Sequence, residues 1–211
     1  MSHIHHRMLG RKSSHRTAML RNLVQSLIEH ESIKTTYPRA KEAQKVADNL
    51  INLAKKNTNA SRNEALKYLY VHQLNEKLFG TIRERYANRG GGFTRVLHIE
   101  PYNGDAAPSA ILELVDGSKD MRFAMTAKAV ARNIYERTAL HPMTLQNVEK
   151  VTRFRTNGKE ELRKLVDYFV EALKKKNERI DSGPRRVHLP SVEDNIISKT
   201  SLGSEPATSP S

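Results

Sequence analysis

Histidine is the residue type in this sequence best suited to catalysis or metal binding, because the chain contains no cysteine. His3, His5 and His6 lie close enough together to bind a metal loosely, but no carboxylate lies near them, and a metal site needs a held geometry. We interpret them as part of a solvated or phosphate-facing arm. His15 lies beside Arg16, and without a nucleophile motif it is better suited to donating to a phosphate than to acting as a base. We therefore expect no catalytic set, no metal and no cofactor.

Two further patterns resemble chemical sites without requiring one. Gly90–Gly92 follows an expected helix and precedes an expected strand, whereas a P-loop needs a lysine and a serine or threonine that open a helix. A helix stop with positive φ accounts for these glycines, although they also let backbone N–H groups approach a phosphate. Glu160 and Glu161 lie at the beginning of an expected helix, where they complement its dipole.

Positive charge is the strongest global signal in the composition. Lys and Arg total 36 against 23 Asp and Glu, which gives a formal net charge of +13 and a pI near 10.0. A compact chain with this excess repels itself unless a polyanion neutralises it, and nucleic acid is the commonest polyanion. The absence of cysteine fits a reducing interior. No apolar run approaches the roughly 18–20 residues that span a bilayer, so we expect an intracellular protein that is not embedded in a membrane.

The elements that must position these residues follow from hydrophobic periodicity and from helix start and stop signals. The predicted elements of the first half are an arm over 1–13, helices over about 14–31, 38–57, 59–69 and 73–88, a short β-like segment over 32–36, and strands over 93–99 and 110–115 joined by a wide loop. Ser13 or Ser14 is expected to cap the first helix, and Asn59 or Ser61 the third. No acidic residue precedes Glu29, so the arm and the first helix carry only positive charge.

The second half is predicted to be helical over about 122–137, 145–151 and 160–176, followed by a Ser/Thr/Pro-rich tail that we expect to be disordered. Together the elements predict an α+β fold, with helices packed on a small β-sheet, a mostly helical C-terminal extension and a disordered tail. The predicted regions are a basic N-terminal arm over 1–13, a core over 14–116, a helical extension over 117–176 and an extended or disordered tail over 177–211.

The basic amphipathic first helix has more than one possible use. Arginine on one face and leucine or isoleucine on the other would suit an anionic membrane surface or the groove of a partner helix. RNA fits better, because basic residues also flank the helix and the glycine run in separate segments of the chain: Arg11, Lys12, Lys34, Arg39, Arg89 and Arg95. A folded surface that meets several RNA strands needs that breadth, whereas a membrane helix does not.

Four ordered blocks of the sequence closely resemble the bacterial-type large-subunit ribosomal protein L17 family. The first is Leu9–Asn22, and the others are Ile33–Thr36 with Pro38–Glu42, Arg89–Leu97, and Gly104–Pro108 leading into Ile111–Val115. The resemblance implies an α/β domain with helices against a small sheet and no enzymatic activity. It also implies binding to large-subunit ribosomal RNA near the polypeptide exit region, with contacts to neighbouring large-subunit ribosomal proteins.

Residues that match the family blocks are carried over one by one as expected RNA contacts. The leading contacts implied by the resemblance are Arg11, Lys12, Ser13, Ser14, His15, Arg16, Arg21 and Asn22. A second tier consists of Lys34, Arg39, Arg89, Gly91, Thr94 and Arg95. Arginine binds phosphate through two nitrogens and stacks on bases, while serine and helix N-terminal amides supply neutral donors. Replacing Arg16 and Arg21 with alanine is predicted to weaken RNA binding with little effect on the fold.

The sequence departs from the bacterial pattern at both ends. Its first eight residues carry histidines where bacterial members have more arginine and lysine, and about ninety-five residues follow the family core. Extended versions are typical of mitochondrial ribosomes, and the acid-free first helix would also serve as an uncleaved matrix-targeting signal. The favoured interpretation is a structural component of the mitochondrial large subunit in the matrix, with a bacterial cytoplasmic form as the alternative location. An RNA chaperone or assembly factor that leaves the mature particle is the alternative function.

Overall fold

The computed structural model describes residues 6–101 and 104–181 of the chain. It divides into one compact unit that ends at Glu171 and a second that begins at Ala172, and the fold described below is that of the first unit. The elements in chain order are α1 (Ser13–His30), β1 (Ser32–Thr36), α2 (Tyr37–Lys56), α3 (Asn59–Leu66), α4 (His72–Lys77), the π-helix η1 (Leu78–Ile82), α5 (Arg83–Arg85), β2 (Thr94–Ile99), β3 (Ser109–Leu114), α6 (Met121–Glu136), α7 (Pro142–Thr152) and α8 (Gly158–Asp181). The predicted α+β class is confirmed.

Helix α1 begins one residue earlier than predicted and without the predicted cap. Lys12 occupies the N-cap position, and no side chain caps the first turn, so the prediction of a Ser13 or Ser14 cap is wrong. The helix ends at Glu31, which adopts a left-handed conformation (φ 62°) and donates its N–H to the carbonyl of Leu27 at 2.8 Å. That C-cap closes the last turn and turns the chain directly into β1.

The sheet has three antiparallel strands in the order β1-β3-β2. Strand β3 is central, and its Leu112 lies opposite Ile33 of β1 and Val96 of β2. The predicted hairpin with a wide loop is therefore confirmed, and the segment expected only as a β-like connector is a full strand. Its partner lies about eighty residues away in the sequence, which is why local pattern could not assign it a place in the sheet.

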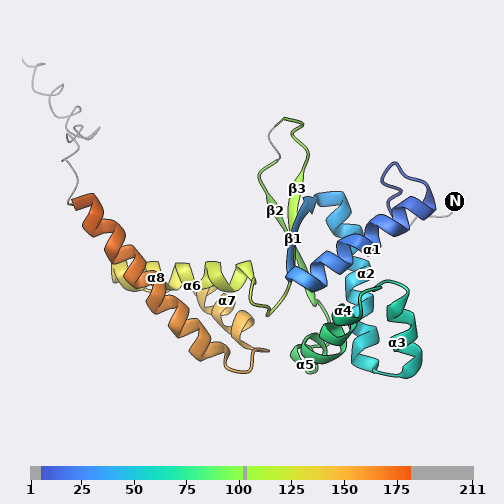
Figure 1. Ribbon diagram of the computed structural model, residues 1–211. Coiled ribbons are helices and arrows are strands. Elements are labelled where there is room, and N and C mark those ends of the chain that lie inside the picture. Colours follow the sequence, from blue (N-terminus) through green and yellow to red (C-terminus); the bar gives the residue numbers. More distant parts are fainter. Residues whose placement is uncertain (1–5, 102–103, 182–211) are drawn as a thin grey trace, which may run out of the picture. The chain divides into compact units, whose positions relative to one another are not determined.

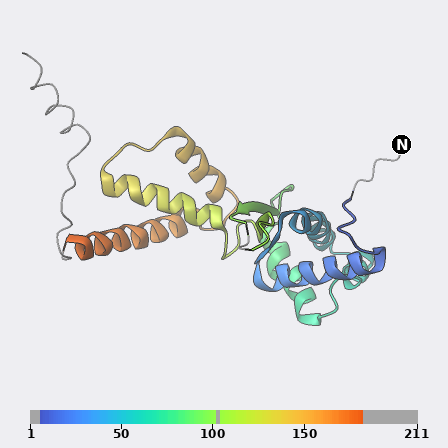
Figure 2. The ribbon, with the colours of Figure 1, turned by 90° about the horizontal axis from the view of Figure 1, so that it is seen from above.

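Helices α1 and α2 pack on one face of this sheet (Figures 1 and 2). Alternate β3 residues Ala110, Leu112 and Leu114 turn inward and are buried, as the two-residue period of a strand requires. The first hydrophobic cluster joins them to the apolar faces of α1 and α2 and to Leu78 and Ile82 of η1. This cluster holds together α1, β1, α2 and β2, which carry most of the predicted RNA contacts.

Three predictions for the middle of the chain need correction. Helix α3 is capped by Thr58, whose side chain accepts from the N–H of Ser61 in a capping box, and not by Asn59 or Ser61 itself. The predicted fourth helix is three consecutive pieces, α4, η1 and α5, and ends at Arg85. The glycine run therefore lies beyond the helix and does not stop it, and of the three glycines only Gly92 has a positive φ.

The three helices predicted after the core are present as α6, α7 and α8 and share a second hydrophobic cluster. Phe123, Ala127 and Ala131 of α6 pack against Val151 of α7 and Leu162 of α8, among others. Asp120 caps α6 by accepting from the backbone N–H groups of Arg122 and Phe123. Helix α8 continues through Asp181, and the rest of the predicted tail lies outside the described residues.

Candidate nucleic-acid interface

The end of the arm and the first turn of α1 form an exposed surface without negative charge. Lys12, Ser13, Ser14 and His15 are all exposed, and no acidic residue lies in the first turn. Arg11 lies half-buried just before them, and its Nη1 donates to the carbonyl of Leu9 at 2.8 Å. Because no side chain caps this helix, its first backbone N–H groups and its positive dipole end remain available to an anion.

Arg16 has an internal partner that the sequence did not reveal. Its Nη2 lies 3.1 Å from Oε2 of Glu42 on α2, and its Nε donates to the carbonyl of Arg7 at 2.7 Å. Glu42 is only 2% exposed and also pairs with Arg7 and Lys45. Burial raises the pKa of Glu42, but the backbone N–H of Arg7 and the charges of Lys45 and Arg16 outweigh it and hold the pKa below its ordinary value. Arg16 thus fastens α1 to α2, so the prediction that its replacement would scarcely affect the fold conflicts with this geometry.

Arg21 is held by aromatic rings and has no ion-pair partner among the described residues. Its Nη1 donates to the hydroxyl of Tyr70 at 2.8 Å, and its guanidinium carbon lies 5.8 Å from the ring centres of both Tyr68 and Tyr70. The Nε atom is buried and has no hydrogen-bond partner in the described part of the chain. Asn22, the next residue, is exposed.

The second-tier residues divide into two groups. Lys34 on β1 and Gly91 before β2 are exposed, and Arg39 in the first turn of α2 is half-buried; within the described residues neither Lys34 nor Arg39 forms an ion pair. Arg89 and Arg95, by contrast, point to carboxylates of the protein itself.

Arg89 and Arg95 belong to a buried network of ion pairs. Arg89 pairs with Asp116, while Arg95 Nη1 lies 2.7 Å from Glu113 and 2.8 Å from Asp120. Arg155, in the segment between α7 and α8, adds longer pairs of 4.0 Å to Asp116 and 3.9 Å to Asp120. These contacts join the end of the sheet to the beginning of the C-terminal helices. The carboxylates of Glu113, Asp116 and Asp120 are almost completely buried.

The three carboxylates of this network titrate differently. Burial raises the pKa of Glu113, and the neighbouring charge of Asp120 adds to the rise. Burial likewise raises the pKa of Asp116 despite Arg89 and Arg155. For Asp120, burial acts in the same sense, but Arg95 and the backbone N–H groups of Asp116 and Phe123 outweigh it and lower the pKa.

Thr94 is also directed inward. Its side chain is buried, and Oγ1 donates to Oδ1 of Asp48 on α2 at 2.9 Å. Arg16, Arg89, Thr94 and Arg95 therefore have internal hydrogen-bonding roles, and RNA contact by any of the four stays a prediction. The other ten predicted residues contact no carboxylate within the described part of the chain.

Sequence reasoning missed the internal partners and the aromatic residues beside Arg21. Tyr68 and Tyr70 lie in the turn and loop that follow α3, so no helix or strand period predicted that both rings would lie beside Arg21. No signal identified Glu42 or Asp120 as partners of distant arginines. Those pairs depend on long-range packing.

A family model described as Ribosomal protein L17 matches residues 19–115. Large ribosomal subunit protein bL17m of Neurospora crassa is 58% identical over 159 residues, which cover 74% of this chain and 82% of that protein. This chain belongs to the ribosomal protein L17 family. The L17 family consists of ribosomal proteins and not of enzymes.

Other L17 relatives come from both fungi and bacteria. Large ribosomal subunit protein bL17m of Schizosaccharomyces pombe is 45% identical over 166 residues, covering 77% of this chain and 80% of that protein. Large ribosomal subunit protein bL17 of Finegoldia magna is 52% identical over 113 residues, covering 54% of this chain and 86% of that protein. The two fungal L17 proteins are mitochondrial forms.

Residues 6–101 and 104–181 contain neither a metal-binding cluster nor a membrane-spanning helix. No group of three or more histidine, cysteine, aspartate or glutamate side chains there is arranged to hold a metal ion. His6 is exposed, whereas His3 and His5 lie outside the described residues. No helix in the same part of the chain has the length and apolar character needed to cross a membrane.

Proposed function

We propose that this L17 protein is a structural component of the large subunit of mitochondrial ribosomes, located in the matrix, where it binds large-subunit ribosomal RNA near the polypeptide exit region. The names of the fungal relatives support the particle and the organelle, and the family resemblance supports the exit region. The protein performs no turnover in this role. It neutralises and clamps RNA segments and contacts neighbouring ribosomal proteins.

The observation that carries the RNA-binding part is the acid-free surface of the arm and α1. The chain has no acidic residue before Glu29, and Lys12, Ser13, Ser14 and His15 are exposed together at an uncapped helix start. Cationic side chains neutralise phosphates and release counterions, while serine hydroxyls and free N–H groups bind phosphate oxygens. A surface of this kind positions folded RNA by its backbone and shape more than by base sequence.

We take ten of the predicted residues as the proposed RNA contacts, because none of them contacts a carboxylate within the described part of the protein. They are Arg11, Lys12, Ser13, Ser14, His15, Arg21, Asn22, Lys34, Arg39 and Gly91. Four predicted residues bond to internal carboxylates instead: Arg16 holds the arm and α1 against α2, Thr94 bonds to Asp48, and Arg89 and Arg95 join the sheet to the C-terminal helices.

A double substitution tests the binding surface. Arg11→Ala with Lys12→Ala should weaken binding to large-subunit ribosomal RNA and flatten the log–log salt dependence by about 0.7–0.9 for each lost phosphate contact. Arg163→Ala with Lys164→Ala on α8 removes the same charge from exposed positions and should leave the slope closer to that of the wild type. Equal slopes for the wild type and the Arg11/Lys12 variant, measured by filter binding, would remove these residues from the interface.

Sedimentation separates a subunit component from an assembly factor. A tagged full-length chain should remain with the large subunit in a high-salt sucrose gradient if it is a structural component. Release into the upper fractions, with the RNA affinity intact, would instead support a chaperone or assembly factor.

A further inference from the structure

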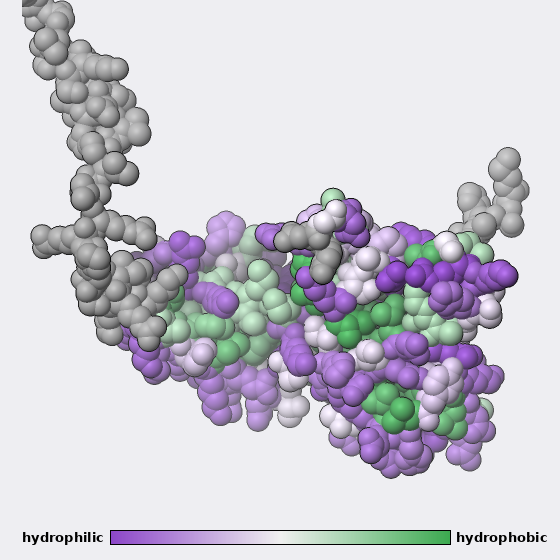
Figure 3. Space-filling model, turned by 45° about the horizontal axis from the view of Figure 1, so that its top comes forward, coloured by the Kyte–Doolittle hydropathy of each residue, from purple (hydrophilic) through white to green (hydrophobic). Residues whose placement is uncertain are grey.

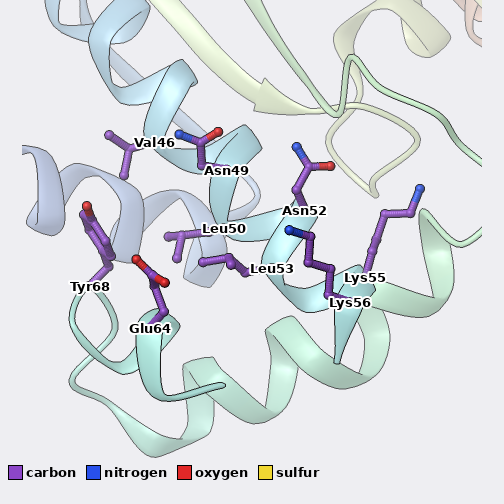
Figure 4. A pocket seen from close by; sticks show the side chains of 9 residues that line it. All are labelled: Val46, Asn49, Leu50, Asn52, Leu53, Lys55, Lys56, Glu64 and Tyr68. Atoms are coloured by element: carbon purple, nitrogen blue, oxygen red, sulfur yellow. The ribbon is translucent and has the colours of Figure 1, made fainter. Parts of the chain in front are cut away.

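A groove of about 750 Å³ runs between α2 and the α3 segment. We call it the α2–α3 groove. Its lining residues are Val46, Asn49, Leu50, Asn52, Leu53, Lys55, Lys56, Glu64 and Tyr68. Figure 4 shows Tyr68 and Glu64 on one side and the α2 side chains on the other, with the two lysines at the end away from Tyr68. From Val46 to Lys56 the α2 axis rises about 15 Å.

The walls of the groove combine hydrogen-bonding and apolar groups. Asn49 and Asn52 are exposed side by side on the outer face of α2, and Lys56 is exposed near its end. Leu53 lies half-buried between them and gives the floor an apolar character. In the space-filling view, hydrophilic residues surround several apolar patches on the visible face of the molecule (Figure 3).

Tyr68 lies at the other end of the groove, and Tyr70 is its neighbour around Arg21. Tyr68 lines the groove directly, and Tyr70 follows two residues later with 61% of its surface exposed. Arg21 fixes both, through the hydrogen bond to Tyr70 and the ring contacts at 5.8 Å. An aromatic ring that is exposed yet held in place is a preformed platform for stacking, because little conformational entropy is lost when a ligand ring packs on it.

We propose that the α2–α3 groove and the adjoining tyrosines bind a short unpaired stretch of RNA. A base stacks on the exposed Tyr70 ring, the amides of Asn49 and Asn52 bond to base edges, and the ammonium of Lys56 pairs with the backbone. Unpaired bases are recognised by stacking on aromatic side chains and by hydrogen bonds to their exposed edges. The proposal rests on the proposed ribosomal RNA-binding function and adds a second, single-strand-selective site to it.

The lining favours RNA over a protein helix. A helix-binding groove presents a continuous apolar surface to residues at positions i, i+3, i+4 and i+7, whereas two amides and two lysines interrupt this one. Glu64 is its only acidic residue, so the charge of the groove is positive. The tyrosines stack equally well on any base.

The test compares the full-length chain with variants for binding to a short single-stranded RNA of mixed sequence and to a duplex of the same sequence. Tyr70→Ala and the double variant Asn49→Ala with Asn52→Ala should each weaken single-strand binding roughly fivefold or more and leave duplex binding unchanged. Tyr70→Phe keeps the ring and should retain affinity within about twofold. The matched controls are Tyr168→Ala, whose side chain is 63% exposed on α8, and Asn63→Ala on α3; both should bind both RNAs as the wild type does.

The outcomes separate this proposal from the broader function. If the wild type binds neither RNA, the RNA-binding function itself fails. If the wild type binds both RNAs and the groove variants match it, the groove proposal is overturned while RNA binding stands. If the groove variants bind RNA normally but no longer enter the large subunit, the groove belongs to a protein partner and the proposal is equally overturned.

Discussion

The two hydrophobic clusters of this chain are built in different ways. The first gathers residues from Leu20 to Leu114 and depends on strand β1 pairing with a strand late in the core. The second runs from Phe123 to Val170 and joins three consecutive helices. Distant pairing requires closure of long loops, whereas neighbouring helices pack at little such cost. The comparison shows a core of long-range contacts followed by a locally organised helical addition.

The junction between the two clusters is polar. Arg89, Arg95 and Arg155 pair with carboxylates there, and two of these guanidiniums lie over rings, Arg155 at 4.0 Å from Phe123 and Arg89 at 4.9 Å from Phe154. Gly117 fits this crowded region because a Cβ atom would lie 2.5 Å from Oε2 of Glu31. Ionic contacts thus occupy the region between the two apolar clusters.

The lengths over which relatives match this chain also differ between the core and the C-terminal helices. The Finegoldia magna protein matches 54% of this chain, close to the extent of the core, whereas the Neurospora crassa protein matches 74%. The longer match cannot fit within the residues up to Asp116, so part of the C-terminal helices is shared with the fungal mitochondrial form.

Breaking the junction is expected to have the largest effect. Asp120 caps α6, accepts from the N–H of Asp116 and pairs with Arg95 while almost fully buried. Asp120→Ala leaves Arg95 with one fewer partner and should lower the free energy of unfolding by about 3–5 kcal/mol. Urea denaturation followed by circular dichroism measures this change. The exposed Asp167→Ala should stay within about 0.5 kcal/mol of the wild type; a similar value for Asp120→Ala would mean that the junction contributes nothing.

Truncating the cores compares their packing directly. Leu112→Ala opens a cavity at the centre of the sheet, where the side chain is fully buried, and should cost about 3 kcal/mol. Leu162→Ala in the second cluster, where 7% remains exposed, should cost about 2 kcal/mol. Thermal denaturation of both variants gives the values. The reverse order would show that the helical addition, and not the sheet region, is the better packed part.

The arm contact gives the smallest expected change and depends on pH. The pKa of Glu42 lies below its ordinary value of 4.5, so its contribution to stability is present above that pH and is lost as pH falls through the lowered pKa. Glu42→Gln should cost about 1 kcal/mol at neutral pH, with the difference from the wild type shrinking below pH 4.5. Asp48→Asn should show the opposite pH dependence, because burial raises the pKa of Asp48 and the wild type therefore loses stability relative to this variant as pH rises. A constant Glu42→Gln difference across this range would contradict the ion-pair account.

The sequence predicted most helices and strands correctly, but it did not predict which distant residues contact each other. The amphipathic repeat predicted α2 closely, and the β-branched run 32–36 marked β1. The cap of α1 and the role of the glycine run were wrong, because short-range signals at helix ends compete with tertiary packing. At the candidate site, exposure of Lys12 to His15 followed from the acid-free pattern, whereas the inward orientation of Arg89 and Arg95 did not.

The sequence alone determined that the chain is a basic α+β protein with an acid-free beginning and the motif blocks of the L17 family, because charge and periodicity are properties of neighbouring residues. Only the tertiary structure decided which cations face solvent and which face a carboxylate. That choice depends on the approach of segments far apart in the chain, such as Arg16 to Glu42 and Arg95 to Asp120. A buried carboxylate requires a partner, and the fold selects which arginine provides it.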